Sequence, residues 1–245
     1  MHAIILFILV TSAVGASENA ISAAGLRASS FGDDGRLSRV FTAQSASGPF
    51  ASPVVRAGRV EFYGKEAPNG VVAALEWEEA KYLKSEEVIS GDRSIQLTTE
   101  DGIVSGKGFR CELDTERLEL RSSVSYKTNA FRMTGEQAKI EFETKRGKRT
   151  DVIRHIAVVG NIVIEQTATA KAPFDRAEST FARYSADESK VFLKAPISAW
   201  RKGQRSVIDA ASGFVEIDLK EQAPNKAPEP TPGAVTPRAT EGTSR

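Results

Sequence analysis

Two clusters of basic side chains have the composition expected of a phosphate-binding site. Residues 145–149 read Lys-Arg-Gly-Lys-Arg and residues 201–205 read Arg-Lys-Gly-Gln-Arg, each where we expect a hairpin turn around the glycine. Guanidinium and ammonium groups bind phosphate through charge-assisted hydrogen bonds, so either cluster could contact a lipid head group or an anionic membrane surface. Charges solvated at ordinary turns are the alternative. In the first cluster we select as head-group contacts Lys145, Arg146, Lys148 and Arg149.

Other residue types that catalyse reactions or hold metals are too few or wrongly spaced. The chain has two histidines, His2 and His155, and one cysteine, Cys111, which do not make a zinc-ligand set. The sequence lacks the motifs of P-loops, nucleophile elbows and zinc proteases, and no pair of carboxylates stands out for acid–base work. We therefore predict that the protein is not an enzyme and has no catalytic residue, metal or cofactor.

The single cysteine is best explained by packing. Cys111 alternates in phase with Phe109 and Leu113, so on a strand all three side chains point to one face. Arg110, the basic neighbour that could activate a thiol, then points to the other face. We predict that Cys111 is a small buried hydrophobe.

Length and charge narrow the class of protein. The chain has 245 residues, 40% of them hydrophobic, which is enough for a core but not for several membrane spans. Lys and Arg total 33 and Asp and Glu total 32, giving a net charge of +1. A balanced charge gives no reason to expect a nucleic-acid partner.

Both ends of the chain differ in composition from its middle. Residues 1–16 have an apolar stretch ending in small residues, which is typical of a signal peptide or short anchor, although no Lys or Arg precedes it. Residues 17–36 are assigned to a poorly ordered leader, and the small residues of 31–53 indicate a loop or an edge strand. Residues 222–245 are rich in Pro, Thr and Ala and are predicted to be disordered.

The body, residues 37–221, is dominated by alternation of apolar and polar residues, which predicts about fourteen short antiparallel strands. Residues 153–164 are expected to form a hairpin bent at Gly160-Asn161. Residues 77–88 could be a helix, but their β-branched and aromatic lead-in favours a strand. Stacked hairpins of this kind predict an all-β fold, an antiparallel β-jelly-roll or folded-over sheet whose apolar faces meet.

One stretch of the body is similar to a known family. Residues 95–102 (IQLTTEDG), followed by 106–109 (GKGF) and 118–124 (LELRSSV), resemble the lipopolysaccharide-export periplasmic proteins of the LptC/LptA (OstA-like) family. Residues 135–142, 160–164, 177–184 and 208–219 resemble hairpins of the same family. The resemblance covers roughly residues 40–221, with a first half, to about residue 128, that looks more like LptC and a second half that looks more like LptA.

The resemblance implies a function. It implies a periplasmic β-jelly-roll that shields lipopolysaccharide acyl chains between an inner-membrane ABC exporter and the outer membrane. It also implies edge-strand pairing with the exporter, with other periplasmic export proteins or with further copies of itself. The residues that would line the lipid groove are Ile103, Phe109, Leu113, Leu118, Leu120, Ile140, Phe142, Ile162, Ile164, Val191, Leu193 and Ile217, with Cys111, Val124, Val215 and Leu219 continuing the same face. The alternative is an exported structural or interaction β-protein with a closed, dry core and no lipid ligand.

Overall fold

A computed structural model describes residues 12–13, 20–31, 35–63, 70–112, 117–145, 148–167 and 174–218. All the regular elements of these residues are strands. They are β1 (Ser12–Ala13), β2 (Ala20–Phe31), β3 (Leu37–Pro49), β4 (Val54–Tyr63), β5 (Val71–Leu83), β6 (Val88–Thr99), β7 (Ile103–Glu112), β8 (Arg117–Lys127), β9 (Phe131–Gly135), β10 (Gln137–Lys145), β11 (Lys148–Gln166), β12 (Arg176–Ser185), β13 (Lys190–Lys194), β14 (Ile197–Arg201), β15 (Gln204–Ile208) and β16 (Phe214–Asp218).

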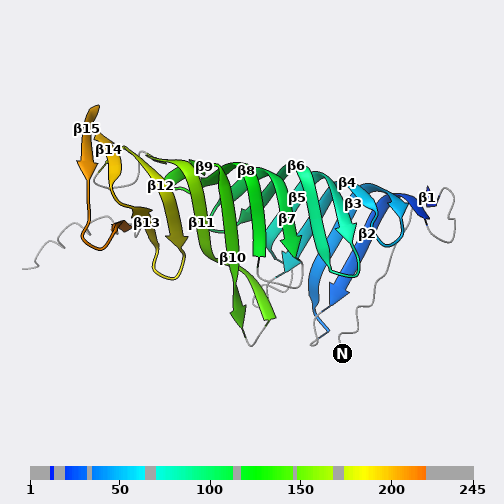
Figure 1. Cartoon of the computed structure of the whole chain (residues 1–245). Coiled ribbons are helices and arrows are strands. Elements are labelled where there is room, and N and C mark those ends of the chain that lie inside the picture. Colours follow the sequence, from blue (N-terminus) through cyan, green and yellow to red (C-terminus); the bar gives the residue numbers. More distant parts are fainter. Residues whose placement is uncertain are drawn as a thin grey trace, which may run out of the picture.

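The strands form one antiparallel sheet of sixteen strands in which sequence neighbours pair almost throughout (Figure 1). β1 and β2 lie at one end of the sheet, and β13 to β16 lie at the other. Short connections between consecutive strands favour this meander, because antiparallel neighbours need only a tight turn. The all-β, folded-over sheet expected from the alternation is confirmed.

Bends in the middle of the long strands fold this sheet over. The pairing register shifts between Trp77 and Lys81, between Gly91 and Ser94 and between Ser105 and Lys107, in three neighbouring strand pairs, with the extra residue on β6 in the first two and on β8 in the third. Each shift marks a bulge, where an extra residue bends the strand and strengthens its twist. Because the bulges lie beside one another, the sheet folds along a single line into two layers.

In the C-terminal half, broken strands make the same fold line. β9 and β10 run end to end between β8 and β11, and Glu136 lies at the break between them. β13 and β14 similarly share β12, with the cis peptide Ala195-Pro196 between them. We call the layer that contains β10, β13 and β16 layer one, and the layer that contains β9, β14 and β15 layer two. Each long strand contributes one half to each layer.

The sheet extends further toward the N-terminus than the composition predicted. β2 and β3 are strands of twelve and thirteen residues that pair along their whole length. The assignments of residues 17–36 to a poorly ordered leader and of 31–53 to a loop or edge strand were therefore wrong over residues 20–31 and 37–49. β2 is built from small residues, and its backbone pairing with β3 compensates for their weak packing.

Two further predictions concern single elements. Residues 153–164 belong to one strand, β11, so the predicted hairpin was wrong: Gly160 (φ 78°) and Asn161 (φ 42°) bend the strand at a register shift without reversing it. Residues 77–83 lie in β5, which confirms the preference for a strand over a helix there. In the described ranges, no helix has the length and hydropathy needed to cross a membrane. The tail, residues 222–245, lies outside the described residues.

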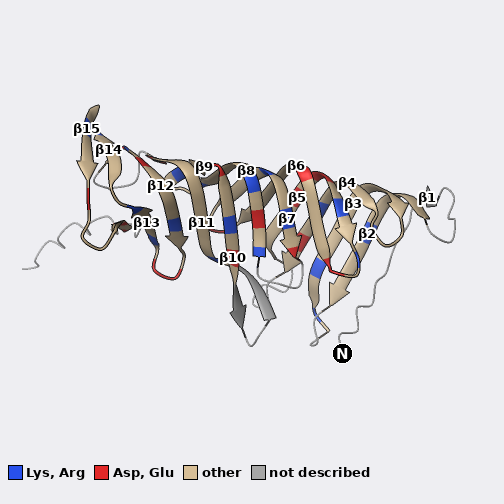
Figure 2. Cartoon of the chain, viewed as in Figure 1, with Lys and Arg blue, Asp and Glu red and all other residues tan. Residues whose placement is uncertain are grey.

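Charged side chains of both signs are spread over the strands (Figure 2). The apolar side chains instead gather between the layers in one core cluster that runs from β3 to β16. The interior of the folded sheet is therefore the candidate site.

Candidate functional site between the two layers

Layer one presents an unbroken row of inward side chains. Register pairing sets one residue of each strand beside the next across β6, β7, β8, β10, β11, β12, β13 and β16. All members are at most 8% exposed. The row consists of Ile89, Cys111, Leu118, Ile140, Ile156, Tyr184, Val191 and Ile217.

Layer two presents a matching row across β4, β5, β6, β7, β8, β9, β11, β12 and β14. Its members are at most 3% exposed. They are Val60, Leu75, Leu97, Val104, Tyr126, Met133, Ile164, Ala177 and Ala199. With neighbouring strands about 4.8 Å apart, the row extends for roughly 40 Å along the sheet. The two rows make a continuous apolar interior.

Most of the residues predicted to line a groove lie in this interior. Their exposed fractions are at most 3%, and each packs within the core cluster. They are Phe109, Leu118, Leu120, Ile140, Phe142, Ile162, Ile164, Val191, Leu193 and Ile217. Cys111 is buried at 1%, as predicted, and Val124 at 2%. The interior is therefore filled by its own side chains, which pack on one another.

Ile103 does not belong to this set, and its prediction as a lining residue was wrong. Its side chain is 40% exposed, whereas its neighbour Val104 is 1% exposed and points inward. At the register shift between Ser105 and Lys107 the extra residue lies on β8, so β7 crosses the fold line with one residue fewer, and its inward phase changes between Val104 and Phe109, where Gly108 is left-handed (φ 65°). A reading with uninterrupted alternation from 103 to 113 puts Ile103 on the wrong face.

Several predicted residues fall outside the description. Leu113, Arg146 and Leu219 lie in undescribed stretches, and the side chains of Lys145, Lys148 and Arg149 are likewise outside the described part. Val215 is partly buried against the core. The second basic cluster, residues 201–205, is described and lies at the turn between β14 and β15, as expected.

Three aromatic rings join the two layers. Tyr126 and Phe131 lie in layer two, near the turn that connects β8 and β9, and Tyr184 lies in layer one, near the turn after β12. The Tyr126 ring is 5.6 Å from that of Phe131 and 5.3 Å from that of Tyr184, and Phe131 and Tyr184 are 6.2 Å apart. We call these three residues the aromatic clasp, because they connect the turn-bearing edges of the two layers. Sequence alone gave no signal for a contact between residues so far apart.

The clasp contains a buried hydroxyl. Tyr126 is 0% exposed, and its Oη forms no hydrogen bond within the geometric limits. Burial raises the pKa of the Tyr126 hydroxyl far above its usual value, and the neighbouring Tyr184 raises it further. Burial also raises the pKa of Tyr184, with an added effect from Asp101. Both hydroxyls are neutral at physiological pH.

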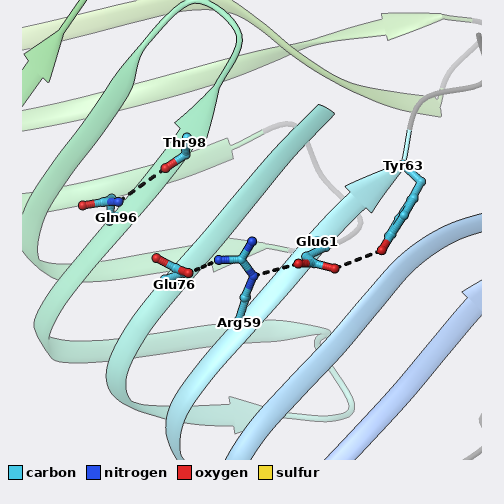
Figure 3. A network of polar contacts seen from close by, with 6 residues as sticks. All are labelled: Arg59, Glu61, Tyr63, Glu76, Gln96 and Thr98. Atoms are coloured by element: carbon cyan, nitrogen blue, oxygen red, sulfur yellow. Dashed lines mark hydrogen bonds and ion pairs between the residues drawn. The ribbon is translucent and has the colours of Figure 1, made fainter. Parts of the chain in front are cut away.

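The outer face of layer two carries a polar network (Figure 3). Arg59 on β4 donates to Glu61 on the same strand (2.9 Å) and forms an ion pair with Glu76 on β5. Tyr63 donates its hydroxyl hydrogen to the other carboxylate oxygen of Glu61 at 2.9 Å. That hydrogen bond is the main cause of the lowered pKa of Glu61. These partly exposed contacts tie β4 to β5 and offer no group arranged for catalysis.

A shallow hollow of about 520 Å³ runs beside the fold line on β4 to β8. Its lining combines apolar positions such as Trp77 and Ile95 with polar ones such as Glu78, Ser94 and Lys107. In the residues that the structure describes, no three His, Cys, Asp or Glu side chains come close enough together to hold a metal ion. The hollow follows the bulged parts of β4 to β8.

Comparison with known proteins adds no further identification. No protein-family model matches this chain, and no curated protein matches it either.

Proposed function

We propose that this protein is a periplasmic lipopolysaccharide-transport component that shields acyl chains in the interior of its folded sheet, as an LptC/LptA (OstA-like) protein does. The observation that carries the proposal is the pair of apolar rows, which face one another along roughly 30 Å without interruption. It would receive lipid from an inner-membrane ABC exporter and pass it toward the outer membrane.

The free energy of acyl chains explains why such a path must be continuous. Each methylene removed from water is worth about 0.8 kcal/mol, so a chain of about fourteen carbons exposed to water costs on the order of 10 kcal/mol. An interior of Ile, Val, Leu and Phe side chains removes that cost at every step. The residues that perform this function need no reactive groups.

Loading requires the two layers to part. The described hydrogen bonds between strands run within the sheet, and the aromatic clasp connects the layers through side chains alone. When the layers part at the aromatic clasp, the interior side chains exchange contacts with one another for contacts with the methylenes of the acyl chains, so the interior stays apolar. The chains would enter between the turn-bearing edges, and the head group would remain outside.

Both ends of the sheet suit pairing with other proteins. β2 pairs on its outer side only with Ser12–Ala13 among the described residues, which leaves most of its length open. β15 and β16 likewise have a described partner on one side only, β14 and β13. Open edges add strands through backbone hydrogen bonds. The exporter, other periplasmic export proteins or further copies of this chain would pair there.

An exported structural or interaction β-protein with a closed, dry core is the second candidate. The observation in its favour is that the predicted lining residues, such as Phe109 and Ile140, are 0% exposed and pack on each other. The two candidates differ in whether the layers open to admit an acyl chain, and this can be measured directly.

The first test is lipid capture. The chain is purified from a lipopolysaccharide-bearing host, with a photo-crosslinking residue at Phe109 or Ile140, and acyl chains are identified by mass spectrometry. A crosslinker at Ile103, which is 40% exposed, is the matched control. Transport predicts lipid adducts at the two interior positions and not at Ile103. Adducts at neither interior position would refute the groove.

The second test locks the layers. In a Cys111→Ala background, Asp101→Cys and Ala186→Cys place thiols at turns of opposite layers, and a flexible, reducible bismaleimide joins them. Joining Asp101→Cys to Thr128→Cys, two turns of the same layer, is the control. Transport predicts that only the first crosslink prevents lipid loading and that reduction restores it. Equal loading with the layers locked and unlocked would favour the dry-core candidate.

A further inference from the structure

The hairpin of β14 and β15 is strongly basic. Residues 197–208 contain Arg201, Lys202 and Arg205 and no acidic residue, so the hairpin carries a charge of +3. None of these three cations has an ion-pair partner among the described residues. In Figure 1 the hairpin stands at the C-terminal end of the sheet.

The hairpin is held rigidly. Lys202 (φ 49°) and Gly203 (φ 79°) form its two-residue turn, in which both residues have the left-handed conformation that suits the twist of a hairpin. Asp175 accepts a hydrogen bond from the Lys202 backbone nitrogen (2.6 Å) and donates its own backbone N–H to the Trp200 carbonyl (2.7 Å). The cations at the turn are therefore presented from a fixed backbone.

The outer face of the hairpin mixes aromatic, apolar and cationic groups. The guanidinium groups of Arg176 and Arg205 lie 5.6 Å and 5.5 Å from the Trp200 ring centre, in neighbouring register positions. Arg205 also donates to the Ser198 hydroxyl at 2.9 Å. Val207, which follows on the same face, is 67% exposed, the most exposed large hydrophobic residue in the described ranges.

We propose that the β14–β15 hairpin docks the C-terminal end of the folded sheet onto a bilayer surface that carries anionic phospholipids. Each cation near such a surface contributes on the order of 1 kcal/mol. Tryptophan is enriched at the interface between head groups and hydrocarbon, and an exposed valine gains by reaching the acyl boundary. An anionic bilayer therefore makes favourable contacts with the cations, with Trp200 and with Val207 at the same time.

Charge complementarity favours this occupant over a protein strand or a second copy of the chain. The edge of β15 could pair with another strand, but backbone pairing would make no use of Trp200 or Arg205, which point from the face of the sheet. A single phosphorylated head group would use the cations and leave Val207 in water. The inference is independent of acyl-chain transport, since it concerns the outer face of layer two.

The test uses the full chain and vesicles of phosphatidylcholine with or without phosphatidylglycerol. The two tryptophans are Trp77, which is 4% exposed in the core, and Trp200, so quenching by brominated lipids reports on the hairpin. We expect quenching only with phosphatidylglycerol present, weakened by added salt. The triple variant Arg201→Gln, Lys202→Gln and Arg205→Gln should bind about 100-fold more weakly, as expected from three cations.

Two controls make the result decisive. The variant Arg93→Gln, Lys107→Gln and Lys127→Gln removes three exposed cations elsewhere and should bind as the parent chain does. Trp200→Phe should abolish quenching while vesicle binding is largely retained. Equal binding to vesicles of phosphatidylcholine alone, an equal loss in the control variant, or binding without quenching of Trp200 would overturn the proposal. If vesicle binding survives the crosslink between Asp101→Cys and Ala186→Cys, membrane docking by the hairpin does not depend on the opening of the layers that transport requires.

Discussion

Removing the hydroxyl of Tyr126 should stabilise the fold. This hydroxyl is 0% exposed and makes only a contact of poor geometry with the Tyr184 hydroxyl, so folding strips it of water without fully replacing the lost bonds. A buried unsatisfied polar group costs about 1–3 kcal/mol. Tyr126→Phe keeps the ring and its contacts with Phe131 and Tyr184, and it should raise the free energy of unfolding by that amount, measured by urea denaturation at pH 8.

The pH dependence gives the same prediction a second readout. Because burial raises the pKa of Tyr126 in the folded state, the tyrosine ionises more easily when unfolded. Its contribution is fully present below the unfolded pKa of about 10 and is lost as the pH rises above it, by about 1.4 kcal/mol per unit. Phenylalanine has no such loss. The advantage of Tyr126→Phe over the parent chain should therefore widen between pH 9 and pH 11.

The matched control is Tyr63→Phe. The Tyr63 hydroxyl lies on the outer face and donates to Glu61 at 2.9 Å, so its removal should destabilise the protein by about 0.5–1 kcal/mol. The reasoning about the clasp is refuted if Tyr126→Phe is less stable than the parent at pH 8. It is also refuted if the gap between the two chains stays constant as the pH rises.

Three further substitutions test the layers, the fold line and the sheet edge. Ile140→Ala should lower the free energy of unfolding by about 2–5 kcal/mol in urea denaturation, whereas Ile103→Ala should change it by under about 0.5 kcal/mol, and equal effects would contradict the assigned phase. Gly160→Ala should cost about 1–3 kcal/mol by thermal denaturation, because its φ is 78°, a left-handed conformation that strains any residue with a Cβ; an unchanged Tm would argue against the bend. Ser22→Lys on β2 should weaken concentration-dependent association in sedimentation velocity, and rods as abundant as those of the parent chain would exclude pairing through β2.

The fold class could be predicted from sequence because a half-buried strand alternates apolar and polar residues. That signal depends only on the nearest residues, and it is strong in segments such as 95–98 and 117–120. The burial of Cys111 follows from the same alternation. The pairing of consecutive strands follows from their short connections, which cannot reach more distant partners.

The phase of the alternation could not be predicted across the fold line. Between the two rows the inward residue changes parity on β7, from Val104 to Cys111, and on β12, from Ala177 to Tyr184, but β6, β8 and β11 keep it. A period-two pattern does not reveal which strands change. The glycines Gly106 and Gly108 were the available signal for a bend in β7, because glycine is the usual residue at left-handed positions, and Gly108 has a φ of 65°. The same ambiguity made Gly160-Asn161 look like a hairpin turn: both residues are left-handed there, but the chain continues in the same direction.

Contacts between the layers could not be predicted at all. Tyr126 and Tyr184 meet because the sheet folds over, and the angle and position of the fold come from bulges on several strands together. Likewise, the small residues of β2 lack the hydrophobic signal of a strand, and only the presence of β3 beside them makes pairing favourable.

The unlike ends of the sheet determine how copies or partners could assemble. β2 is a strand of twelve residues with one charged residue, Arg27, whereas the opposite edge is divided into two strands of five residues that carry Arg205, Glu216 and Asp218. When the β2 edge of one copy joins the β15 and β16 edge of the next, two unlike surfaces meet, so the contact is heterologous and produces open rods. A long, weakly charged edge accepts a partner strand more readily than a divided, charged one. If the hairpin of β14 and β15 rests on an anionic bilayer, as we propose, the sheet edge left free for a protein partner is β2, and the path between the two apolar rows leads from that partner to the membrane.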